Sequence, residues 1–173
     1  VLSRIDLQRL AERLGVDDGG RADSDGAGGD GALRRDVRGL GVGRIESDGA
    51  DVESNFFAQG SVYWHGFGGF YLKGDGARVQ SRRYGQGAGI HTALGALHVE
   101  GSRNRLLHWG VGPGFGWDWG SGYAEVRGDL NELYADWGSG KGDVNGHGLV
   151  WIDGSGNRAH LGEGGNGQLK RSA

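Results

Sequence analysis

The chain contains no cysteine and no methionine, and only one of its 173 residues is proline. Without cysteine the sequence excludes disulfides, thiolate metal sites and a cysteine nucleophile. No run of apolar residues reaches the 18 or so that a membrane-spanning helix needs, so we expect no membrane span. The formal net charge of −3 is small and negative, which argues against a nucleic-acid partner. Neither the compartment nor the oligomeric state is indicated.

Glycine is the residue in excess. The chain has 40 glycines, whereas average usage would give roughly 12 in this length. A glycine inside a helix or strand costs roughly 0.5–1 kcal/mol relative to alanine, so we expect most of them to lie in turns. The same composition would follow if the chain were translated from the strand opposite a GC-rich gene, where alanine codons read as glycine. A chain with no selected function is therefore one alternative.

The first 15 residues predict an N-terminal amphipathic helix, which spans residues 3–14. Its apolar side chains recur at the three- and four-residue spacing of one helix face, and they are Leu7, Leu10, Ala11 and Leu14.

Aromatic residues divide the rest of the chain. Residues 16–55 are rich in glycine and aspartate and contain no aromatic residue, so they bury little apolar surface and are predicted to be mobile. All 16 aromatic residues lie between Phe56 and Trp151. We therefore predict a folded β body over residues 56–161 and a polar tail over residues 162–173.

Turn signals recur within this body at a spacing of about 8–12 residues. Residues 74–76 (Gly-Asp-Gly) separate two short apolar segments, residues 70–73 and 77–80, and residues 145–146 (Asn-Gly) do the same further on. Such dipeptides supply the positive φ angles of hairpin turns. The pattern predicts a mainly β fold: a small antiparallel sandwich or barrel-like sheet, with a short N-terminal helix and long Gly/Asp-rich loops. Further strands are expected at three places: residues 61–66, 90–99 and 104–109.

One segment of the body favours a helix instead. In residues 129–137 the apolar side chains follow helical spacing, Asp129 can cap the first turn and Gly138 can end the helix. The same residues could form a hairpin around residues 128–129.

Residues 109–123 carry glycine at almost every second position, with mostly aromatic side chains between. A period of two predicts a β-strand with one bare face and one aromatic face. Trp117, Trp119 and Tyr123 would then form a row with a spacing of about 7 Å, which suits stacking against sugar rings. With Asp118 they are the candidate ligand-binding residues. The alternative is that these rings are ordinary core packing.

No motif assigns a reaction, a catalytic residue or a cofactor. The six histidines show no spacing typical of a zinc site, so no metal is predicted. The sequence favours a non-catalytic binding or structural module, with carbohydrate as the candidate ligand. A second alternative is a hydrolase in which His65 or His147 pairs with Asp118 or Asp153.

Overall fold

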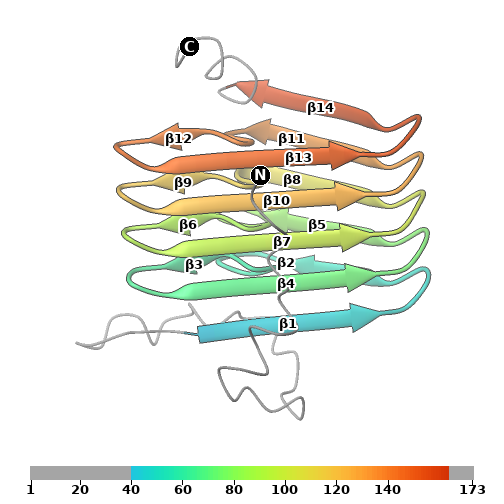
Figure 1. Cartoon of the computed structure of the whole chain (residues 1–173), viewed down its shortest axis with the longest axis horizontal. Coiled ribbons are helices and arrows are strands. Elements are labelled where there is room, and N and C mark those ends of the chain that lie inside the picture. The colour runs from blue at the N-terminus through green and yellow to red at the C-terminus, as the bar shows by residue number, and fades with distance from the viewer. Residues whose placement is uncertain (1–39, 164–173) are drawn as a thin grey trace.

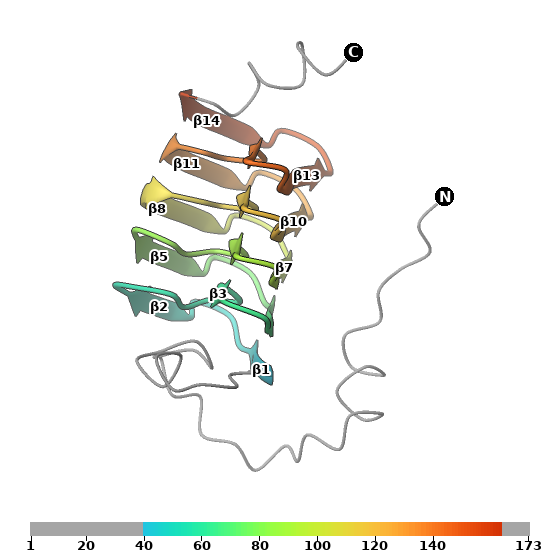
Figure 2. The same ribbon diagram turned by 90° about the vertical axis from the view of Figure 1, so that its left-hand side faces the viewer.

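The computed structural model describes residues 40–163, which form a β-solenoid of about five turns (Figure 1). These residues contain strands in three sheets and no helix, and all strand pairs are parallel. The chain passes through each sheet once per turn, and each turn stacks on the previous one (Figure 2). The predicted antiparallel sandwich or barrel is therefore wrong.

Two sheets consist of longer strands and the third of two-residue strands. The first sheet contains β1 (Leu40–Glu46), β4 (Phe67–Lys73), β7 (Leu94–Glu100), β10 (Ser121–Arg127) and β13 (His147–Asp153). The second sheet contains β2 (Asp51–Ser54), β5 (Arg78–Arg82), β8 (Arg105–Val111), β11 (Glu132–Trp137) and β14 (Arg158–Glu163). The third sheet contains β3 (Val62–Tyr63), β6 (Gly89–Ile90), β9 (Gly116–Trp117) and β12 (Gly142–Asp143).

Each turn of the solenoid is about 27 residues long. Phe67 lies opposite Leu94, and Leu94 lies opposite Ser121. Contacts between equivalent side chains of neighbouring turns accordingly join residues 27 apart, and the step shortens to 26 between the last two turns. This regular spacing aligns equivalent positions into columns that run along the solenoid axis.

The predicted hairpins are wrong because their turns lead the chain into a different sheet. Residues 74–76 connect β4 in the first sheet to β5 in the second. The backbone N–H of Gly74 donates to the carbonyl of Glu100 at 2.9 Å, one turn away rather than across a hairpin. At Gly101 (φ +139°) an added Cβ would lie 2.0 Å from the carbonyl oxygen of Gly74, so this stacking requires glycine. Residues 145–146 likewise connect β12 to β13.

Inward-facing side chains form two hydrophobic clusters. The larger lies between the first and second sheets and contains Phe70, Leu72, Ala77, Val79, Leu97, Val99, Leu106, Ala124, Val126 and Leu133. The smaller lies next to the third sheet and consists of Phe57, Ala88, Ile90 and Phe115, with Tyr63, Tyr84, Val111, Trp117 and Trp137 packed against it.

The segment expected to be helical is strand β11, so the helix over residues 129–137 is a wrong prediction. Its side chains alternate as a strand requires: Leu133 and Ala135 are buried, and Tyr134 between them is exposed. Pairing with β8 on one side and β14 on the other satisfies the backbone without a helix.

Three predicted segments lie partly or wholly outside the described residues. The N-terminal helix lies outside them. The segment 16–55 is described from Leu40, and it contributes β1 and β2 to the solenoid. Of the tail 162–173, only Gly162 and Glu163 are described, at the end of β14. In the described part of the chain no helix is long and apolar enough to span a membrane.

Candidate ligand-binding site

The third sheet leads into the first through a two-residue corner that recurs in four turns. We call these residues the aromatic corner: residues 64–65, 91–92, 118–119 and 144–145. They lie in the loops at the left of Figure 1, between each short strand and the next strand of the first sheet. Their sequences are Trp-His, His-Thr, Asp-Trp and Val-Asn.

All eight residues of the aromatic corner have positive φ angles, between 46° and 67°. Left-handed backbone costs a residue with a side chain roughly 1–2 kcal/mol, and β-branched residues such as Thr92 and Val144 are the least suited to it. The chain is rich in glycine, yet it places other residues at every one of these positions. Strained backbone of this kind clusters at binding and active sites, so the corner is a candidate site.

Backbone hydrogen bonds hold the four corners in register. His65 donates its N–H to the carbonyl of His91 at 3.1 Å, and Thr92 donates to Asp118 at 3.0 Å. Trp119 donates to Val144 at 3.3 Å. Successive corners are therefore separated by about 4.8 Å, the usual distance between paired strands. Two columns of side chains result: Trp64, His91, Asp118 and Val144 in one, and His65, Thr92, Trp119 and Asn145 in the other.

Each of the two columns contains one exposed indole, and the first also contains a polar pair. Trp119 is 66% exposed and Trp64 is 44% exposed. In the column of Trp64, Nδ1 of His91 is hydrogen-bonded to the carboxylate of Asp118. The imidazole of His91 also lies 5.1 Å from the Trp64 ring and 5.0 Å from the Trp117 ring, measured between centroids. The corner thus offers flat apolar surfaces beside a hydrogen-bonding carboxylate.

The four predicted site residues lie in three different places. Asp118 and Trp119 are in the aromatic corner, and Trp117 precedes them in β9, half-buried against the smaller core cluster. Tyr123 is in β10, on the outer face of the first sheet, where burial and then the Glu125 carboxylate raise its pKa to about 12. The predicted continuous strand over residues 109–123 is therefore wrong, because it is divided among β8, β9 and β10.

The sequence analysis missed Trp64 and His91 as members of the site. Neither is close in sequence to residues 117–119, but His91 is 27 residues before Asp118, and Trp64 is 27 residues before His91. The signal that would have found them is the turn length of the solenoid, which brings positions 27 apart into contact.

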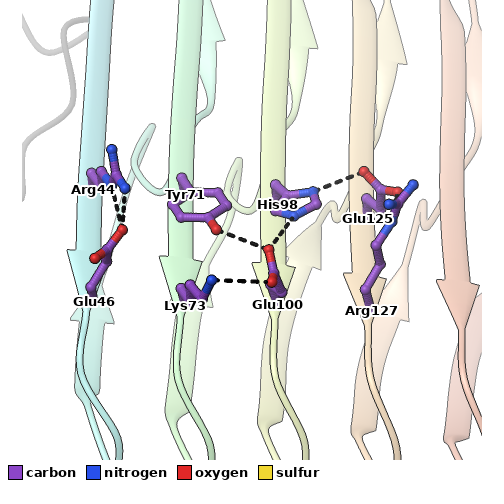
Figure 3. A network of polar contacts seen from close by, with 8 residues as sticks. All are labelled: Arg44, Glu46, Tyr71, Lys73, His98, Glu100, Glu125 and Arg127. Carbon is purple, nitrogen blue, oxygen red and sulfur yellow. Dashed lines mark hydrogen bonds and ion pairs between the residues drawn. The ribbon is translucent and has the colours of Figure 1, made fainter. Parts of the chain in front are cut away.

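The histidine–carboxylate pairs differ from those expected for a hydrolase. Asp118 pairs with His91 rather than with His65 or His147. A second group lies on the outer face of the first sheet, where Nδ1 of His98 is 2.8 Å from Glu125 and its Nε2 is 3.9 Å from Glu100 (Figure 3).

This second group is one polar network, and its members are paired with one another. The hydroxyl of Tyr71 donates to Glu100 at 3.0 Å, and Lys73 lies 3.4 Å from the same carboxylate. Burial, followed by this hydrogen bond, raises the pKa of Tyr71 to about 12. Burial alone would raise the pKa of Glu125, but hydrogen bonds from His98 and neighbouring groups outweigh it and lower that pKa. The network links neighbouring turns and leaves no unpaired acid or base for a reaction among the residues drawn in Figure 3.

Residues 40–163 contain no cluster of three or more histidine, aspartate or glutamate side chains that could hold a metal ion. Comparison of the chain with family models, curated proteins and solved structures gives no match. The geometry of the aromatic corner is accordingly the basis for assigning a function.

Proposed function

We propose that the solenoid is a non-catalytic module that binds carbohydrate at its aromatic corner. The observation that carries this proposal is the set of eight strained, non-glycine residues at four stacked corners, which present Trp64 and Trp119 to solvent. Glycine adopts positive φ without strain. Other non-glycine residues of the described solenoid also have positive φ, but only the aromatic corner has two of them in succession in each of four turns.

The chemistry of the corner supports a sugar as the ligand. A pyranose ring has an apolar face of C–H groups, which stacks on an indole, and a rim of hydroxyl groups, which need hydrogen-bond partners. Trp119 supplies the first kind of contact, and the Asp118 carboxylate beside it supplies the second.

The openness of the corner supports binding rather than catalysis. The Asp118 side chain is 39% exposed, and the neighbouring indole is exposed further. Enzymes that activate a carboxylate or a histidine usually exclude water from it, since a dry site strengthens electrostatic interactions. A surface of this type can hold a ligand without transforming it.

The test is a glycan array followed by titration, with Trp119→Gly as the test variant. Because Trp119 already has φ +60°, glycine relieves strain there and the fold should be preserved. We expect Trp119→Gly to weaken binding about tenfold, which corresponds to the loss of one stacking contact.

The matched control is Trp109→Ala, which removes another exposed indole from β8 in the second sheet. It should leave binding unchanged. The proposal is wrong if the native chain binds no glycan, or if Trp119→Gly binds as the native chain does. A thermal melt followed by circular dichroism completes the test, because a chain with no selected function would show no cooperative transition.

A further inference from the structure

We infer that the ligand of the aromatic corner is a linear, neutral oligosaccharide that lies along the solenoid axis with one sugar unit per turn. This inference rests on the proposed function and specifies its ligand.

The direction of the ligand follows from the direction of the columns. Equivalent corner residues are stacked along the axis and joined by backbone hydrogen bonds from one turn to the next. Their spacing of about 4.8 Å is close to the length of one sugar unit in an extended chain. An oligosaccharide parallel to the axis therefore stays in step with the turns, whereas one that crosses the strands meets a single corner.

The minimum length of the ligand follows from the two indoles. Trp64 and Trp119 lie in the first and third corners, two turns apart, so they are separated along the axis by about 10 Å. A single sugar ring cannot stack on both. Trp64 belongs to the first column and Trp119 to the second, so a ligand that reaches both indoles spans three turns and both columns. We assign its end rings to the two indoles and its middle ring to His91 and Thr92, and Asn145 then meets a fourth unit.

The charge of the corner excludes acidic ligands. Its eight residues include the Asp118 carboxylate and contain no lysine or arginine. A uronic acid or sulfated sugar would meet a like charge without a compensating cation. Single-stranded nucleic acid also stacks on aromatic rings, but it needs a basic groove for its phosphates.

The experiment measures affinity against ligand length by titration calorimetry. The probes are cello-, xylo- and manno-oligosaccharides, each as the disaccharide, trisaccharide, tetrasaccharide and hexasaccharide. For the series that binds, affinity should rise with each unit as far as the tetrasaccharide and then level off, because the described solenoid has four such corners.

The variant Trp64→Gly separates this inference from the proposed function. It should weaken tetrasaccharide binding about tenfold and remove most of the gain in affinity from the disaccharide to the tetrasaccharide, because only Trp119 then stacks on a sugar ring. If the disaccharide binds the native chain as tightly as the tetrasaccharide, carbohydrate binding stands and one unit per turn is wrong. If none of the three series binds while another glycan does, carbohydrate binding stands and the neutral ligand is wrong. If no glycan binds, or if oligothymidylate displaces the sugar, both are wrong.

Discussion

Two of the solenoid's corners use left-handed backbone in different ways. Five segments join the first sheet to the second: residues 47–49, 74–76, 101–103, 128–130 and 154–156. The first begins with Ser47, and the other four, which we call the glycine corner, begin with glycine. The aromatic corner has no glycine at its positive-φ positions.

The difference between the corners is one of space. At the first position of the glycine corner the preceding turn lies directly against the backbone, and a Cβ on Gly101 or Gly128 would approach a carbonyl oxygen within about 2 Å. At the aromatic corner most side chains are exposed. Glycine is therefore compulsory at the first position of one corner, whereas at the other the chain tolerates strain and keeps side chains that can contact a ligand.

The largest effect should come from Gly101→Ala. The new Cβ would meet backbone that cannot move aside, so we expect a loss of about 3–5 kcal/mol in the free energy of unfolding, measured by urea denaturation. Gly76→Ala is the matched control, since Gly76 has φ +68° and nothing within 4 Å of an added Cβ. It should cost only about 1 kcal/mol. Equal losses in the two variants would show that the backbone packed against Gly101 does not determine the cost.

The next effect concerns a histidine in the closed interior. Burial lowers the pKa of His108 to about 4, whereas an unfolded histidine titrates near 6.5. The unfolded histidine takes up a proton below about pH 6.5 and the folded one only below about pH 4. Full stability is therefore present above about pH 6.5 and is lost as the pH falls from there towards 4. The expected total is about 3 kcal/mol.

Urea denaturation at several pH values checks this loss. His108→Gln should remove that part of the acid dependence, although it also disturbs the hydrogen bond between His108 and Ser81. His65→Gln, at the exposed aromatic corner, should leave the dependence as it is. A pH profile that His108→Gln does not flatten would contradict the assignment.

A smaller loss is expected from Asn131→Ala, directly after the glycine corner. The Asn131 side chain is buried, accepts a hydrogen bond from the Asn104 backbone at 2.8 Å and donates one to the Gly101 carbonyl at 3.0 Å. Alanine would leave these backbone groups unsatisfied, at a cost of about 2 kcal/mol in the free energy of unfolding. Asn157→Ala, in the same column but half-buried, should cost less in the same urea assay. The reverse order would mean that burial does not set the cost.

The smallest effect has the opposite sign. Val144 is a half-exposed β-branched residue with φ +48°, so Val144→Gly should raise the free energy of unfolding by about 0.5–1 kcal/mol. Leu149→Gly, at an exposed position within strand β13, should lower it by about 1 kcal/mol. If both variants are destabilised alike, the aromatic corner is not strained and the contrast between the corners disappears.

The sequence predicted β-structure but not its topology. Strands were expected at residues 61–66, 90–99 and 104–109, and β3, β7 and β8 overlap these ranges. The antiparallel arrangement was inferred from local turn dipeptides. These dipeptides require positive φ in a hairpin and in a solenoid corner alike, so they do not distinguish the two.

The missing signal was long-range. Gly68, Gly95 and Gly122 recur at intervals of 27 residues, and Gly74, Gly101 and Gly128 do the same. In a chain with 40 glycines this interval is hidden among chance spacings. The interval becomes visible only when successive 27-residue segments are aligned with one another, so that buried apolar residues such as Leu72, Val99 and Val126 coincide.

The candidate site was predicted in part, for a related reason. Asp118 and Trp119 were identified because they are adjacent in an aromatic segment. Trp64 and His91 contribute to the same surface from other turns, and local periodicity along one strand contains no information on neighbours across strands.

The stacking of 27-residue layers does not fix the number of layers in this molecule. Each layer touches only the layers above and below it, as in other stacked repeats. Excising residues 94–120 would bring Ser121 opposite Phe67 and keep the equivalent positions of the remaining turns aligned. The length of such a chain can therefore change by whole layers. Its outer surface then becomes longer or shorter along the solenoid axis with each layer added or removed.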